Sequence, residues 1–257
     1  MAFGGEIILR PRSWRRLLRF GAFATAAALS PSTYGPQARA VAVRQIYLTA
    51  WKVLPGYLAF TALLSVVIIE VVRNGARAYG LSQVALELVL RVLVLELIPF
   101  LTALFVALRS GAAIGAEIAL MRVSGQLEDE EEAGRSPLHE ELVPRVVGAA
   151  LAVFSLTTLA IALAMYLSYA LFFGGSNAGL IVFTRVVGQV FDLQIFVGLL
   201  LKCLLFGVAV AVIPLATGLE AEPGQPGSMP AAVLAGLMKL FLVIGLIEIL
   251  SLMVKYV

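Results

Sequence analysis

A few charged side chains interrupt the long apolar runs of this sequence, and they are the residues best placed for chemistry. Glu96 lies deep in one such run, with Pro99 one helical turn further along. A carboxylate in so apolar a segment is energetically costly, which makes Glu96 a candidate for function. The alternative is a structural role, in which the carboxyl group is neutral or pairs with Arg91. Glu87 and Arg91 are spaced i,i+4, which favours a simple ion pair on a helix.

Lys239 and Glu248 are two further charges in an apolar run near the end of the sequence. Because they are nine residues apart, a helix places them on nearly the same face. They either line a cavity or carry their charges toward water along their long stems. The sequence contains no P-loop and no nucleophile with a neighbouring base, so we expect neither covalent catalysis nor a cofactor in this chain. His139 and Cys203 are single residues of their kinds, which excludes a histidine-rich metal site and a disulfide framework.

The composition excludes most soluble folds. Apolar residues make up 61% of the chain and charged residues only 14%, whereas soluble domains carry about 45–50% and about 25%. The mean hydropathy is +0.98, and a bilayer accommodates this much apolar surface. The net charge of +3 does not indicate nucleic-acid binding, because the basic residues flank hydrophobic segments, as membrane orientation requires. No cleavable signal peptide is expected, since the first residues lack a compact apolar region.

The fold class is therefore predicted to be an all-α integral membrane protein. A membrane-spanning helix needs about 20 mostly apolar residues, and five segments qualify. They are approximately Trp51–Val72, Val84–Leu108, Leu142–Phe173, Leu193–Thr217 and Ala231–Val254. None of them alternates apolar with polar residues, as the strands of a membrane β-barrel would.

The flanking charges predict the orientation of these spans. Lys and Arg are concentrated before residue 53 and in the loop expected at 109–145. The positive-inside rule places both of these regions in the cytoplasm. With an odd number of spans, the C-terminus is then expected on the opposite side, outside the cell membrane.

Residues 1–43 have a character of their own, and residues 44–257 are expected to form the transmembrane domain. Trp14 lies on an apolar helical face, whereas Arg15, Arg16 and Arg19 lie on another. This pattern is typical of a helix in the membrane interface, with its arginines among anionic headgroups. The alternative is a short basic tail that only fixes the topology.

The most informative stretch runs from Glu96 to Arg145 and reads ELIPFLTALFVALRSGAAIGAEIALMRVSGQLEDEEEAGRSPLHEELVPR. Its small residues from Gly111 to Ala116 make a surface that another helix can approach closely. Glu117 and Arg122 then mark an exit from the lipid. The whole stretch resembles, without gaps, the signature region of the MlaE/YrbE family of ABC permeases, and Arg44–Thr49 resembles the entry to the first span of that family. The match retains, among others, Glu96, Pro99, Arg109, Gly111, Glu117, Arg122, Gln126, Gly134, Pro137 and Arg145.

The resemblance implies a permease subunit of a phospholipid transporter in the bacterial inner membrane. Its implied partners are a cytoplasmic ABC ATPase that binds ATP and Mg²⁺, an MCE-domain protein, and a second copy or a paralogue of the permease. The segment 124–137 corresponds to the coupling helix of the family. The residues implied in coupling are Arg122, Gln126, Leu127, Glu128, Glu131, Gly134 and Pro137. Those implied in the cavity or the dimer interface are Glu96, Pro99, Arg109, Gly111, Gly115 and Glu117.

The sequence also departs from the family pattern. Glu128–Glu132 is a run of consecutive acids where the family alternates acidic with apolar residues, and like charges at this spacing weaken a helix. This departure motivates an alternative hypothesis, in which the chain is a divergent accessory permease of a heterodimer. An ATP-independent carrier or channel is a further alternative, which the lack of internal repeats disfavours.

Overall fold

The chain forms a bundle of long helices. A computed structural model describes residues 19–22, 26, 36–133, 141–222, 224–225 and 227–256, and these ranges contain helices and turns but no strand. Five helical paths are long and apolar enough to cross a membrane. They are Arg39–Ala78, Val84–Val123, Val143–Phe173, Leu193–Gly218 and Ser228–Lys255. The predicted all-α membrane fold with five spans is thereby confirmed.

The first path is built from α3 (Pro36–Ile46), a π-helical turn at Tyr47–Trp51 and α4 (Leu54–Ala78). It begins well before the span predicted from hydropathy. A close contact between α3 and the third path explains why the helix extends this far. A Cβ atom on Gly148 would lie only 2.7 Å from the carbonyl oxygen of Ala42, so this position requires glycine.

The second path runs through α5 (Ser82–Val89), η3 (Leu90–Leu97), α6 (Ile98–Val106), η4 (Ala107–Gly111) and α7 (Ala112–Val123). The predicted end at Leu108 was wrong, because the segment expected to begin a loop continues as helix to Val123. Its 40 residues extend about 60 Å at 1.5 Å per residue, about twice the thickness of the hydrocarbon layer. Arg109, which is exposed, ends the apolar run but not the helix.

Two turns of this path are π-helical, and the first has a clear cause. Pro99 has no backbone N–H, and its ring would collide with the preceding turn of a regular α-helix. The chain accommodates Pro99 by widening to a π-helix over Leu90–Leu97, and the N–H of Ile98 bonds to the carbonyl oxygen of Leu93, five residues back. Glu96 lies in this widened segment, a type of distortion that is frequent at functional sites.

The remaining helices are α8 (Gln126–Glu132), α9 (Val143–Phe173), α10 (Asn177–Val190), α11 (Leu193–Gly218) and α12 (Ser228–Tyr256). Hydropathy does not predict α10, because this helix is too short to span a bilayer. Its start is nevertheless marked in the sequence, since the Ser176 side chain accepts a hydrogen bond from the N–H of Gly179, as an N-cap residue does.

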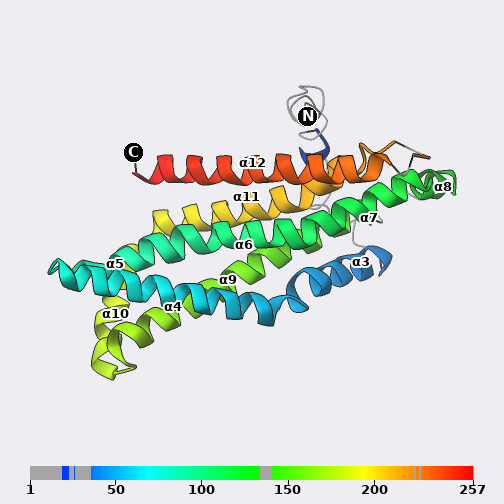
Figure 1. Ribbon diagram of the computed structural model, residues 1–257. Helices are drawn as coiled ribbons and strands as arrows, with labels where there is room; N and C mark the ends of the chain where they lie inside the picture. Colours follow the sequence, from blue (N-terminus) through cyan, green and yellow to red (C-terminus); the bar gives the residue numbers. More distant parts are fainter. Residues whose placement is uncertain are drawn as a thin grey trace.

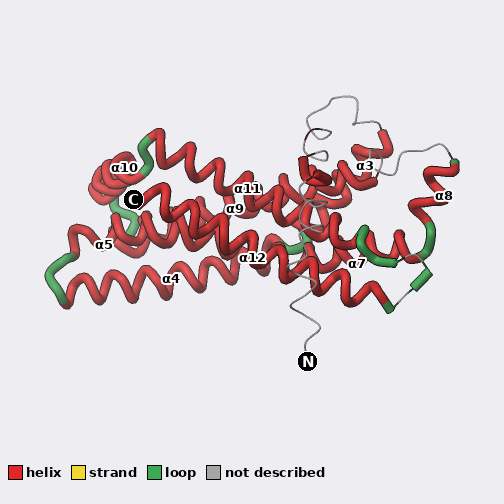
Figure 2. The backbone as a smooth tube through the Cα atoms, turned by 90° about the horizontal axis from the view of Figure 1, so that it is seen from above, coloured by secondary structure: helices red, strands yellow, loops and turns green. Residues whose placement is uncertain are grey.

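The long helices lie side by side along one direction (Figures 1 and 2), and the bundle has two distinct ends. We call the end with α5, α10 and the C-terminus the α10 end, and the end with α3, α7 and α8 the α8 end. In Figure 1, α11 and α12 lie on one side of the bundle, and α4 and α10 lie on the other. The main apolar core between them includes Leu90, Leu93, Leu156, Phe206 and Leu240.

Candidate functional site

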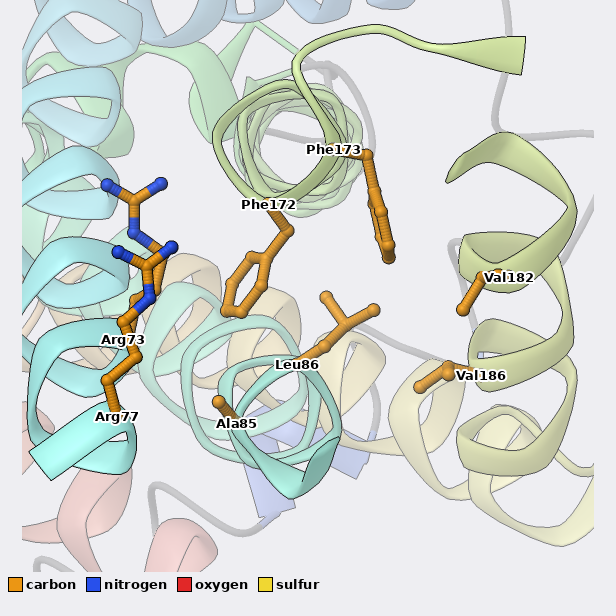
Figure 3. A pocket seen from close by; sticks show the side chains of 8 residues that line it. All are labelled: Arg73, Arg77, Ala85, Leu86, Phe172, Phe173, Val182 and Val186. Atoms are coloured by element: carbon orange, nitrogen blue, oxygen red, sulfur yellow. The ribbon is translucent and has the colours of Figure 1, made fainter. Parts of the chain in front are cut away.

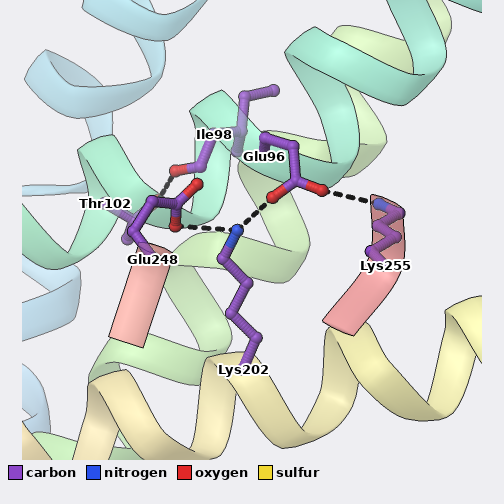
Figure 4. A network of polar contacts seen from close by, with 6 residues as sticks. All are labelled: Glu96, Ile98, Thr102, Lys202, Glu248 and Lys255. Atoms are coloured by element: carbon purple, nitrogen blue, oxygen red, sulfur yellow. Dashed lines mark hydrogen bonds and ion pairs between the residues drawn. The ribbon is translucent and has the colours of Figure 1, made fainter. Parts of the chain in front are cut away.

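A cluster of four charged side chains lies inside the bundle, toward the α10 end (Figure 4). The Lys202 ammonium group donates to Glu96 at 2.5 Å, and the Lys255 ammonium group donates to the other oxygen of Glu96 at 2.6 Å. Lys202 also forms an ion pair with Glu248 at 2.8 Å, at an angle that does not make a hydrogen bond. We call Glu96, Lys202, Glu248 and Lys255 the Glu96 cluster.

Three helical paths supply the Glu96 cluster. Glu96 comes from the π-helical segment before Pro99, and Lys202 comes from α11. Glu248 and Lys255 both come from α12, where a spacing of about two turns places them on one face. Two carboxylates and two ammonium groups balance in charge, so the bundle encloses the polar groups without a net charge.

Burial makes this arrangement energetically significant. The exposed fraction is 3% for Lys202 and 8% for Glu96. Buried ion pairs add little net stability, because desolvation offsets their attraction, although removing one partner typically costs about 3–5 kcal/mol. Charges that are this costly in a membrane segment and add little to stability are candidates for function.

A second polar link lies beside the cluster, on the helical path that carries Glu96 (Figure 4). Thr102 donates its hydroxyl proton to the carbonyl oxygen of Ile98 at 2.8 Å. The Tyr57 hydroxyl must therefore be the donor in its 2.5 Å contact with the Thr102 hydroxyl. Both side chains are buried, so this bond ties α4 to α6 next to the widened turn.

The sequence located part of this site. It singled out Glu96, and it predicted the Glu87–Arg91 ion pair, which the structure confirms at 2.8 Å. Pairing of Glu96 with Arg91 was wrong, because Glu96 faces α11 and α12 instead. Lys239 does not join Glu248 either. It is fully buried and pairs with Glu220 at 3.1 Å.

Lys202 and Lys255 were missed as site residues. One signal for Lys202 was available, since it interrupts the apolar run of α11 as Glu96 interrupts that of the second path. Opposite charges in two different spans are candidates to pair, because each is costly alone in the bilayer.

The predicted close approach at the small residues is confirmed within the chain. Gly111 and Gly115 face Pro214 of α11, and a Cβ atom on either would be in ordinary contact with it. The tightest contact is at Gly218, where a Cβ atom would lie 2.8 Å from the carbonyl oxygen of Gly115. This surface is therefore used to pack α7 against α11.

The predicted coupling segment forms the short helix α8 at the end of α7. Arg122 forms an ion pair with Glu128, which fixes the angle between the two helices. Leu127 is buried against the bundle, whereas Gln126 and Asp129 are exposed. Glu131 lies in α8, and Gly134 and Pro137 lie outside the described residues.

Another ion-pair group fixes α7 to the start of α9 at this end. The buried Arg145 pairs with Glu117 at 3.0 Å and with Glu141 at 2.6 Å. Glu117 was predicted as a cavity or interface residue, and the structure places it in this ion-pair group with Arg145. The group therefore links α7 to α9.

The N-terminal segment is described only in part. Trp14, Arg15 and Arg16 lie outside the described residues, whereas the helical turn at 19–22 begins with an exposed Arg19. Phe20 in this turn packs on the apolar cluster around Val212 of α11. The interfacial helix stays a prediction.

The chain is similar in sequence to known membrane proteins. Residues 42–254 match the family model described as "Permease MlaE". A protein of Synechocystis sp., named "Probable ABC transporter permease protein", is 32% identical over 161 residues, which is 57% of each chain.

A protein of Arabidopsis thaliana, named "Protein TRIGALACTOSYLDIACYLGLYCEROL 1, chloroplastic", is 27% identical over 150 residues. That match covers 57% of this chain and 43% of the Arabidopsis protein, so the matches span about half the length of these relatives. The family model covers most of the five-span bundle, including Glu96, Lys202 and Glu248. The chain therefore belongs to the MlaE permease family.

Proposed function

We propose that this chain is the membrane-spanning permease subunit of an ATP-driven transporter that moves phospholipid. The observation that supports this proposal most directly is the Glu96 cluster, which places paired charges inside an apolar bundle of a permease family. A phospholipid has an apolar body and a charged head, so its path needs both surfaces. ATP and Mg²⁺ would bind to a separate cytoplasmic ABC ATPase, and an MCE-domain protein would exchange the lipid at the periplasmic side.

The cluster offers a way to accept a charged headgroup without leaving a buried charge unpaired. Lys255 lies near the end of α12, and its side chain is 18% exposed, against 3% for Lys202. In the proposed step, Lys255 turns from Glu96 to the lipid phosphate, while Lys202 continues to neutralise Glu96. When the lipid leaves, Lys255 returns to Glu96.

The second helical path gives the ATPase a mechanical connection to this cluster. One continuous helix joins Val123, beside α8, to the π-helical segment that carries Glu96. The ion pair between Arg122 and Glu128 fixes α8 to that helix. A push on α8 would therefore shift the helix along its axis and change the distance between Glu96 and Lys202.

Substituting Glu96 tests this proposal. Glu96→Gln removes the charge that both lysines share, so ATP-driven phospholipid transfer should fall at least roughly tenfold, the loss expected when a charge-assisted contact is removed. The assay is transfer of labelled phospholipid by the complex of permease, ATPase and MCE protein in proteoliposomes. Glu87→Gln is the matched control, because it removes the surface pair of the same helix. Equal transfer by Glu96→Gln and the wild type would contradict the role of the cluster.

The permease is proposed to act as a dimer, either of two copies or with a related permease. The acidic α8 departs from the family pattern and so favours the heterodimer, in which the related permease supplies the usual coupling helix. Mild-detergent purification of the tagged chain with mass spectrometry distinguishes them. A second permease at equal amounts indicates the heterodimer, and recovery of this chain without any ATPase would contradict the ABC assignment and favour a carrier or channel.

A further inference from the structure

A cavity of about 290 Å³ lies at the α10 end of the bundle (Figure 3). Its walls come from α4, α5, α9 and α10, whereas the cluster is built from η3, α11 and α12. The lining residues are Arg73, Arg77, Ala85, Leu86, Phe172, Phe173, Val182 and Val186. Its volume is near the lower end of the range for small-molecule pockets, about 300–1,000 Å³, so it suits part of a lipid rather than a helix.

The cavity is charged on one side and apolar on the other. Figure 3 shows Arg73 and Arg77 beside one another on α4, with Phe172 and Leu86 between them and the valines of α10. A pocket with an apolar body and a few convergent polar groups is the usual form of a ligand site. The polarity here matches a phosphate joined to a hydrocarbon chain.

The two arginines differ in how they are held. Arg73 donates to both oxygens of Glu70 at 2.7 Å and to the carbonyl oxygen of Leu171 at 2.5 Å. These bonds fix its guanidinium group, but its Nε is buried and has no hydrogen-bond partner among the described residues. Arg77, one turn further, is exposed and makes no ion pair in the described part of the chain.

A structural explanation accounts for only part of this pattern. Basic residues near a helix C-terminus complement the helix dipole, and α4 ends at Ala78. That explanation requires neither an apolar cavity beside the arginines nor a buried donor without a partner. The predicted topology also places this end outside, where the positive-inside rule makes Lys and Arg less frequent.

We propose that this cavity binds the phosphate group and the first part of an acyl chain of an anionic membrane phospholipid. Arg77 contacts the phosphate, since it is exposed and a guanidinium group matches phosphate oxygens in pairs. Arg73 lies beside it and is held in place by Glu70. Phe172, Val182 and Val186 cover the chain. This site is separate from the proposed transport path, so its test measures binding and does not depend on transport.

The probe is phosphatidylglycerol with a photoreactive acyl chain, added to the purified full chain in detergent micelles. Crosslinked peptides are identified by mass spectrometry, and label is expected on α10 around Val182. Arg77→Gln should reduce the label at limiting probe roughly tenfold, because one charge-assisted contact is lost. Arg185→Gln is the control, since Arg185 is exposed on α10 but does not line the cavity.

A second variant fills the cavity without changing its charge. Val182→Trp should abolish the label. Ile181 is 65% exposed and does not line the cavity, so Ile181→Trp should keep the label. Both variants should unfold at temperatures close to that of the wild type, because both positions are exposed. A matched photoreactive diacylglycerol, which has no phosphate, should label α10 weakly.

Three results would overturn the proposal. The first is undiminished label in Arg77→Gln or Val182→Trp, and the second is equal label by the neutral diacylglycerol. The third is loss of label on adding millimolar inorganic phosphate, which would indicate that the cavity recognises a free phosphate rather than a lipid.

Discussion

At the scale of single residues, Lys202 is the centre of the Glu96 cluster, since it contacts both carboxylates. Replacing it with methionine keeps most of the side-chain volume and leaves Glu96 its ion pair with Lys255, but it removes the ion pair that Glu248 makes. Unfolding in detergent should therefore be easier by about 3–5 kcal/mol, the usual cost of leaving a buried charge unpaired. The measurement is denaturant or thermal unfolding of the purified chain.

The control for this prediction is Lys52→Met, because Lys52 is exposed and surface substitutions usually change stability by less than about 0.5 kcal/mol. The double variant Lys202→Met/Glu248→Gln removes the charge that loses its partner, because Glu96 keeps its ion pair with Lys255, and it should recover part of the loss. Equal stability of Lys202→Met and the wild type would show that the cluster is not held together in the isolated chain.

Sequence reasoning reached Glu96 but not its partners, and the reason is physical. The cost of a charge in an apolar run can be judged locally, whereas pairing depends on which helices pack together. Arg91 is closer to Glu96 in sequence than Lys202 is, yet the widened turn before Pro99 directs Glu96 toward α11. No local pattern indicates that rotation.

At the scale of helices, hydropathy located the five spans but not where they end. The end of a predicted span is set by where the apolar character of the sequence falls off, whereas a helix ends where its hydrogen bonds or its packing stop. Arg109 therefore ended the predicted second span, although packing of Gly115 and Gly218 continues the helix to Val123. The amphipathic α10 was missed because its apolar face is too short to be recognised as a span.

The acidic helix α8 carries a prediction about the ATPase. Its first turn contains Glu128 and Asp129, where the helix dipole stabilises acidic residues. Because Arg122 neutralises Glu128, the exposed Asp129 and Glu132 are left to face a partner. Asp129→Asn/Glu132→Gln should weaken ATPase binding severalfold and make it less sensitive to salt, since exposed charges are screened.

ATPase binding to the wild type and to the variant is measured at low and high ionic strength, for example with the permease immobilised in nanodiscs on a sensor surface. Glu87→Gln/Glu70→Gln serves as the control, because it removes two acids far from α8. Binding that is independent of salt in the wild type would show that the acidic face does not dock on a basic groove.

At the scale of the whole molecule, the two ends of the bundle should face different compartments. The α8 end carries Arg39 and Arg44 of α3 together with Arg122 and Arg145, so the positive-inside rule predicts that it lies in the cytoplasm. The α10 end, with the proposed lipid cavity and the C-terminus, then faces the periplasm. This predicted orientation would give α8 access to the proposed cytoplasmic ATPase and Lys255 access to lipid at the outer side.

Single introduced cysteines test this orientation, because Cys203 is buried and can be replaced with alanine as a background. Thr184→Cys on α10 should react with a membrane-impermeant maleimide in cells whose outer membrane is permeabilised and whose inner membrane is intact. Asp129→Cys on α8 should react only after the inner membrane is opened. The reaction in opened membranes is the control that shows that this cysteine can be labelled. Both positions are exposed, so burial inside the protein does not account for a difference in labelling. The reverse pattern would place α8 outside, where no ATP is available, and would contradict an ATP-driven mechanism through this helix.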